Sequence, residues 1–81
     1  MEVRIRLGSN LARFAPAPLF RLELPDNATV ADLYDRLAST APELAPALGS
    51  ALPVVAGAHV SRARTLSPGE EIALLTPVAG G

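Results

Sequence analysis

The sequence predicts an α+β fold in which one main helix packs on one face of a mixed four- to five-stranded sheet, followed by an extended C-terminal tail. Three observations support this prediction. Alternating polar and apolar residues, typical of strands, occur at both ends of the chain. One stretch between them has apolar residues at helical spacing. The chain then closes on Gly80 and Gly81, which bring no side-chain bulk.

The first strand is expected at residues 2–7, where polar and apolar residues alternate without a break. Residues 8–18 are expected to form a loop, because this stretch contains two prolines. Alternation resumes over residues 20–24 and predicts the second strand. The period of two assigns these side chains to the core: Val3, Ile5, Leu7, Phe20, Leu22 and Leu24.

An amphipathic helix is expected from about Val30. Thr29 followed three residues later by Asp32 is an Asp-bearing version of the capping box, which marks a helix start. Pro42 blocks continuation of the helix. The buried face is predicted from four apolar residues at helical spacing: Val30, Leu33, Leu37 and Ala41.

The second half of the chain is expected to return to the sheet. Residues 42–50 mix leucines with proline and glycine and are interpreted as a partly packed connector. Residues 52–56 predict a third strand, and a turn at Gly57 leads to a short fourth strand at residues 59–60. A turn containing Pro68 and Gly69 precedes the last strand at residues 71–75.

This order of elements places the first and last strands side by side in parallel, because the connection through the helix is right-handed and covers one sheet face. In the last strand Ile72 and Leu74 face the core, and Leu75 points to the opposite face. The plan is that of the β-grasp, or ubiquitin-like, fold. Residues 1–75 are expected to form the domain and residues 76–81 a flexible Gly-Gly tail.

Composition narrows the function. The net charge is −1 and the seven basic residues are scattered arginines, which argues against nucleic acid as a partner. The absence of cysteine leaves no thiolate for metal binding or nucleophilic attack and is compatible with a reducing cytosol. No apolar run approaches the length of a membrane span. We expect a cytoplasmic protein with no membrane partner.

Catalytic residues are not evident in the sequence. The single histidine, His59, lies beside a turn and is interpreted as a solvated side chain, not as a metal ligand. Glu70 and Glu71 are adjacent in an extended segment and would point to opposite faces, so they cannot form a carboxylate pair. There is no phosphate-binding loop. We expect a carrier or substrate of enzymes, with no metal and no permanently bound cofactor.

Several segments together resemble the small subunit of molybdopterin synthase and, more broadly, the sulfur-carrier family of ubiquitin-like β-grasp proteins. They are Thr29-Val30-Ala31-Asp32-Leu33 at the helix start, Leu66-Ser67-Pro68-Gly69-Glu70-Glu71 before the last strand, and Pro77-Val78-Ala79-Gly80-Gly81 at the end. The resemblance covers nearly the whole chain, although only the tail is specific. The segment Arg13-Phe14-Ala15 and the length fit the molybdopterin branch better than the thiamine carriers.

The resemblance implies a mechanism. An E1-like adenylating enzyme would use ATP to join AMP to the carboxylate of Gly81, and sulfur from a persulfide donor would convert the adenylate into a thiocarboxylate. The tail residues Pro77, Val78, Ala79 and Gly80 would insert into the large subunit of molybdopterin synthase. Sulfur would then pass to a pyranopterin precursor of the molybdenum cofactor.

Partner docking is expected at Leu75, where an exposed apolar side chain would adjoin the root of the tail, with the Phe14 loop as the second candidate. Several alternatives remain open: a carrier for thiamine, cysteine or secondary-metabolite biosynthesis, a protein modifier conjugated to lysines, or a non-catalytic β-grasp interaction module. All basic residues are arginine. The lack of lysine is consistent either with a carrier that avoids acylating itself or, more simply, with a genome rich in G and C.

Overall fold

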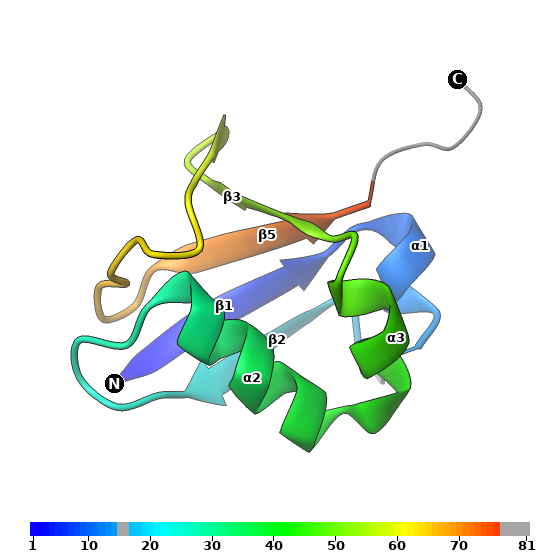
Figure 1. Ribbon diagram of the computed structural model, residues 1–81, viewed down its shortest axis with the longest axis horizontal. Helices are drawn as coiled ribbons and strands as arrows, with labels where there is room; N and C mark the ends of the chain where they lie inside the picture. Colours follow the sequence, from blue (N-terminus) through cyan, green and yellow to red (C-terminus); the bar gives the residue numbers. More distant parts are fainter. Residues whose placement is uncertain (15–16, 77–81) are drawn as a thin grey trace.

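The computed structural model describes residues 1–14 and 17–76, and in them a five-stranded sheet carries its helices on one face (Figure 1). The strands are β1 (Glu2–Leu7), β2 (Leu19–Glu23), β3 (Leu52–Val55), β4 (Ala58–His59) and β5 (Glu71–Leu75). The helices are α1 (Ser9–Ala12), α2 (Val30–Thr40), a 3-10 turn (Pro42–Leu44) and α3 (Ala45–Leu48).

The strand order is β2-β1-β5-β3-β4, with β1 and β5 parallel at the centre and the remaining pairs antiparallel. The parallel register places Ile5 opposite Ile72 and Leu7 opposite Leu74. All four side chains lie on the face covered by α2 and are at most 5% exposed. The order, the parallel central pair and the covering helix confirm the predicted ubiquitin-like β-grasp fold.

Helix α2 begins as the sequence predicts. The Thr29 hydroxyl accepts a hydrogen bond from the Asp32 backbone N–H at 3.3 Å, and the Asp32 carboxylate accepts one from the Thr29 N–H at 2.9 Å. Val30, Leu33 and Leu37 are fully buried against the sheet, as their spacing indicates. Capping and burial act together here, since neither alone would fix so short a helix in water.

Tyr34 is a buried residue that the helical spacing did not select. It is 5% exposed, and its hydroxyl donates to the Ala51 carbonyl oxygen at 2.8 Å. Burial raises the pKa of this hydroxyl, and the nearby Arg62 guanidinium partly offsets the shift. Arg62 lies 4.1 Å from the ring centroid, so Tyr34 links α2 to the segments that lead into and out of β3 and β4.

The expected loop over residues 8–18 is wrong at its start, where Ser9–Ala12 form the single helical turn α1. Its one strongly apolar residue, Leu11, is fully buried and anchors the turn to the core. The connector over residues 42–50 is partly packed as expected, through buried Leu44 and Leu48, but is itself helical. Strands β2 and β4 each begin one residue earlier than the alternation predicted.

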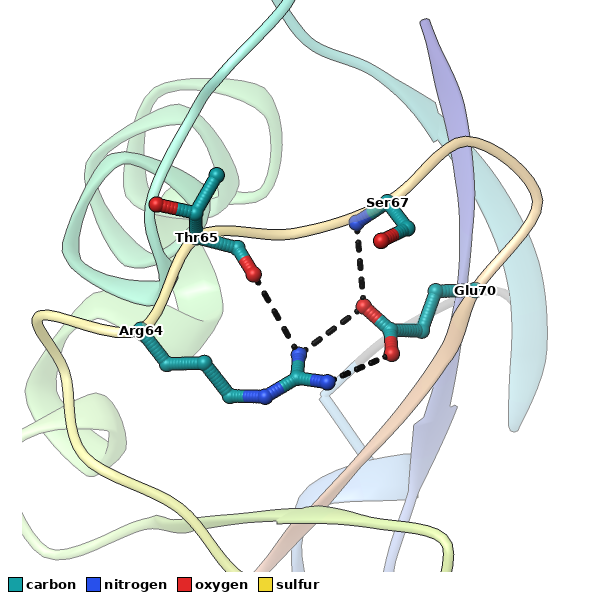
Figure 2. Close-up of polar contacts among 4 residues, drawn as sticks. All are labelled: Arg64, Thr65, Ser67 and Glu70. Atoms are coloured by element: carbon teal, nitrogen blue, oxygen red, sulfur yellow. Dashed lines mark hydrogen bonds and ion pairs between the residues drawn. The ribbon is translucent and has the colours of Figure 1, made fainter.

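An ion pair between Arg64 and Glu70 stabilises the segment before β5, residues 64–70 (Figure 2). The guanidinium donates to both carboxylate oxygens, Nη1 to Oε1 at 2.9 Å and Nη2 to Oε2 at 2.8 Å. The Ser67 N–H donates to the same carboxylate at 3.0 Å. Hydrogen bonding from Arg64 is the main reason that the pKa of Glu70 lies below its usual value.

Candidate functional site

Strand β5 ends at Leu75, one residue before the described part of the chain ends at Thr76, and the Leu75 side chain faces away from the helices. Ile72 and Leu74 are fully buried, whereas Leu75 is 41% exposed. The alternation of a strand places Leu75 on the uncovered sheet face. The structure therefore supports the predicted position of Leu75 at the root of the tail.

Leu75 is one of three exposed leucines on the uncovered face. Leu52 lies directly opposite Leu75 in the antiparallel register of β3 and β5, and Leu19 lies opposite Arg6 in the β1–β2 pair. Directly paired residues share a face, and Leu19 and Leu52 are each 42% exposed. We call Leu19, Leu52 and Leu75 the leucine face.

Charges on the same side of the sheet are largely paired with one another. Arg6 Nε lies 3.0 Å from Glu71 Oε2, and this hydrogen bond is the main cause of the lowered pKa of Glu71. Arg21 lies 3.8 Å from Glu2. The three leucines are the large exposed apolar side chains of this face, which makes them the candidates for contact with an apolar partner surface.

The end of β5 and the next residue, Thr76, are hydrogen-bonded to α1 and to Gly8, which precedes it. The Gly8 N–H donates to the Leu74 carbonyl oxygen at 2.9 Å, and the Asn10 side-chain amide donates to the Thr76 hydroxyl at 3.2 Å. A Cβ at position 8 would lie 3.2 Å from Leu75 Cδ2. Glycine at position 8 thus lets Leu75 lie close against the end of β1.

The second docking candidate, Phe14, follows α1. Its backbone N–H donates to the Leu11 carbonyl oxygen at 3.0 Å, and its ring is 43% exposed with the Arg13 guanidinium 6.0 Å from the centroid. Phe14 is therefore available at the surface but belongs to the segment after α1, not to a sheet strand. The proposed tail residues, Pro77, Val78, Ala79, Gly80 and Gly81, lie outside the described residues.

The side chains capable of acid-base chemistry do not converge in the described part of the chain. His59 is exposed on β4, Glu70 is engaged by Arg64, and Glu71 is engaged by Arg6. Over residues 1–14 and 17–76 no three acidic or histidine side chains are grouped so as to bind a metal ion. None of the helices in these ranges has the length and apolar character required to cross a lipid bilayer.

Sequence reasoning missed three contributors to this site. Leu52 and Leu19 were not assigned to the uncovered face, although strand alternation around the buried Pro53 and Leu22 could have placed them there. Asn10 was missed because a four-residue helical turn is too short to show a period. Its contact with Thr76 joins residues 66 positions apart, which no local pattern reveals.

The chain was compared with known protein families and with solved structures. The profile of the ThiS family matches residues 10–81. SAMP1 from Haloferax volcanii is 25% identical over 100% of both chains, with a TM-score of 0.89. Small archaeal modifier protein 1 from Methanosarcina acetivorans is 24% identical, with 99% of this chain and 96% of that chain covered and a TM-score of 0.84.

A chain from the complex of subunits 1 and 2 of the molybdopterin-converting factor of Helicobacter pylori 26695 is 21% identical over 100% of both chains, with a TM-score of 0.72. At this identity the likeness establishes a shared fold. No curated protein sequence is a significant match to the chain.

Proposed function

The chain belongs to the ThiS family of ubiquitin-like proteins, and from this premise we propose that it carries sulfur as a thiocarboxylate on its terminal residue, Gly81. Family membership makes it a small sulfur carrier or modifier. The finer proposal is that an E1-like enzyme adenylates the Gly81 carboxylate and that sulfur then replaces one carboxylate oxygen. In this role the chain is a co-substrate, and ATP is consumed by the activating partner.

The chemistry assigns a simple task to each part of the molecule. The Gly81 carboxylate attacks the α-phosphorus of ATP, and pyrophosphate leaves. The terminal sulfur of a persulfide donor then attacks the activated carbonyl carbon, and AMP leaves. A thiol reductant next cleaves the S–S bond of the acyl disulfide so formed, which releases the thiocarboxylate on Gly81 and leaves the donor sulfur in a disulfide with that thiol. These reactions occur in partner enzymes, so the carrier must supply a tail that reaches their reacting groups and a surface that docks outside.

The observation that carries this proposal is the end of β5 beside the leucine face, followed by a sequence that ends in two glycines. The residues from Thr76 to Gly81 can span at most about 20 Å when fully extended. A partner that binds the leucine face could therefore receive Gly81 in a buried catalytic site. Gly80 and Gly81 would pass a narrow channel because neither has a Cβ.

We propose the large subunit of molybdopterin synthase as the sulfur acceptor. Support comes from the shared fold with a chain from the Helicobacter pylori complex of molybdopterin-converting factor subunits 1 and 2. Acceptor enzymes of thiamine, cysteine or secondary-metabolite biosynthesis remain alternatives, because the leucine face and the tail would serve any of them. The acceptor can be identified by testing which purified enzyme takes sulfur from the thiocarboxylated carrier.

A second candidate function, protein modification, is favoured by the likeness to the modifier proteins of Haloferax volcanii and Methanosarcina acetivorans. The same adenylated Gly81 would then be attacked by a lysine amine of a target protein. The chain has no lysine of its own, so conjugates could not grow by linkage through its side chains. Lysine-linked chains of the modifier could therefore not form, and we expect an immunoblot ladder with one step per modified target lysine.

Removal of Gly80 and Gly81 tests the carrier proposal. We expect the truncated chain to lose all adenylation, measured as ATP-pyrophosphate exchange with the activating enzyme of the source organism. The midpoint of thermal unfolding should hardly change, because terminal residues contribute little to stability. Gly80→Val, which restricts the backbone and adds bulk, should impair exchange in the folded protein. Full exchange activity of the truncated chain would refute the proposal.

A further inference from the structure

The strongest additional feature of the molecule is the contact between the α1 turn and the first residue after β5. Asn10 Nδ2 donates to Thr76 Oγ1 at 3.2 Å, across 66 positions of sequence. Thr76 is half-buried although it lies outside the strand. The residue from which the tail departs is thus bound to a second element of the fold.

The α1 turn is a firm support for this contact. Leu11, next to Asn10, is fully buried in the core. The Gly8 carbonyl oxygen accepts from the Leu11 and Ala12 N–H groups, both at 2.9 Å, which closes the turn. The Gly8 N–H meanwhile binds the Leu74 carbonyl oxygen at 2.9 Å. Figure 1 shows α1 beside the end of β5. Asn10 therefore lies on an element that is fixed both to the core and to β5.

We propose that Asn10 and Thr76 are positioning residues that set the direction in which the tail leaves the domain. This inference rests on the proposed function, in which residue 81 must enter a partner's catalytic site. The hydrogen bond from Asn10 restricts the orientation of Thr76, the first residue of the tail, before a partner binds. A segment that already has the orientation it needs in the complex loses less conformational entropy when it binds.

The length of the tail makes its root an effective place for such control. Five residues beyond Thr76 extend over at most about 17 Å. A change in the direction of the chain at Thr76 can displace Gly81 by a substantial part of that length. Productive alignment of reacting atoms requires ångström-scale placement. Breaking the contact between Asn10 and Thr76 should therefore widen the range of tail directions that binding to the partner must restrict, and so weaken binding of the carrier.

Three variants separate this role from a general effect on stability. Thr76→Val keeps the shape of the side chain and removes the hydroxyl acceptor. Thr76→Ser keeps the acceptor and serves as the rescuing control. Asn10→Ala removes the donor from the other side. Asn10 is exposed and Thr76 is half-buried, so we expect each variant to fold with an unfolding midpoint close to that of the unaltered chain.

The first measurement is the backbone ¹⁵N order parameter of residue 76, which needs no partner enzyme. It should fall in Asn10→Ala and in Thr76→Val towards the values of flexible segments, below about 0.6. In Thr76→Ser it should stay at the value of the unaltered chain. Equal order parameters in all four proteins would show that the contact does not restrain the root, and would overturn the inference.

The second measurement is ATP-pyrophosphate exchange with the activating enzyme. The KM for the carrier should rise about two- to tenfold in Asn10→Ala and Thr76→Val, the range expected for one net hydrogen bond. The kcat should be unchanged, since the contact biases binding and not the chemical step, and Thr76→Ser should keep the KM of the unaltered chain. An equal KM in all variants, with an active unaltered chain, would overturn the positioning role alone. No exchange by the unaltered chain would refute the proposed function and the inference with it.

Discussion

Breaking the ion pair of Arg64 and Glu70 is expected to lower the stability of the domain by an amount that depends on pH. Glu70→Gln removes the negative charge with little change in shape. In the unaltered chain the Glu70 carboxylate accepts three hydrogen bonds, two from Arg64 and one from the Ser67 N–H. The carboxamide of glutamine keeps one oxygen acceptor but directs its NH₂ group at an Arg64 donor, so at least one charge-assisted bond is lost.

The size of the effect follows from the exposure of the pair. A hydrogen bond to a charged group contributes about 1.5–3 kcal/mol when it is protected from solvent. The Arg64 side chain is 35% exposed and the Glu70 side chain 17%, so solvent screening reduces the loss expected for Glu70→Gln to about 1 kcal/mol at pH 7. For a domain of this length each kcal/mol changes the unfolding midpoint by about 4–8 °C.

The sign of the pH dependence is fixed by the lowered pKa of Glu70 in the folded state. Because the unfolded chain binds this proton at a higher pH, the pair contributes its full stability above the unfolded pKa, near 4.3. That contribution is lost as the pH falls through the folded pKa. The difference between the unaltered chain and Glu70→Gln should therefore be largest at pH 7 and smaller at pH 3.

Thermal unfolding followed by circular dichroism at both pH values measures this difference directly. Glu71→Gln is the matched control, because Glu71 also has a lowered pKa but belongs to a more exposed pair with Arg6. The control should lower stability less than Glu70→Gln does, because solvent screens the more exposed pair. A destabilisation by Glu70→Gln that is equal at pH 7 and pH 3, or absent at pH 7, would refute the assigned role of the ion pair.

Three further predictions concern the core, a turn and the leucine face. Leu33→Ala should lower the free energy of unfolding by about 2–5 kcal/mol in urea titration, whereas Arg21→Ala should stay within about 0.5 kcal/mol; the reverse order would show that the registers are misassigned. Ala56 has φ +51° in the turn between β3 and β4, so Ala56→Asn should raise stability by about 0.5–1 kcal/mol; unchanged or lower stability would contradict strain at this position. Leu75→Asp should weaken binding to the activating enzyme more than tenfold, or by more than about 1.4 kcal/mol, with the circular dichroism spectrum retained; unchanged calorimetric affinity for both the activating and the acceptor enzyme would move the docking site to Phe14.

The strands and the main helix could be predicted from the sequence because their signals are local and agree with one another. In β1 and β5 a strict period of two selects the residues that are buried, and in α2 the Thr29 and Asp32 pair marks the first turn. The parallel pairing of β1 with β5 followed from the handedness of the crossover. For these elements, local preference and tertiary packing favour the same structure.

The parts that could not be predicted depend on contacts between distant residues. Tyr34 is buried because the segment before β3 offers the Ala51 carbonyl oxygen to its hydroxyl. The α1 turn forms because Leu11 reaches the core and Gly8 lies against the end of β5. The same limit applies to the site: the exposure of Leu75 followed from alternation, but its pairing with Leu52 required the sheet register.

The most direct test of the central claim is the intact mass of the protein after incubation with ATP, the activating enzyme and a sulfide source. We expect a mass gain equal to the exchange of one oxygen for one sulfur, located on the C-terminal peptide by fragmentation. The gain should be absent without ATP and absent in the chain that lacks Gly80 and Gly81. An unchanged mass, with an activating enzyme that charges another carrier under the same conditions, would contradict the assignment of Gly81 as the sulfur-bearing residue.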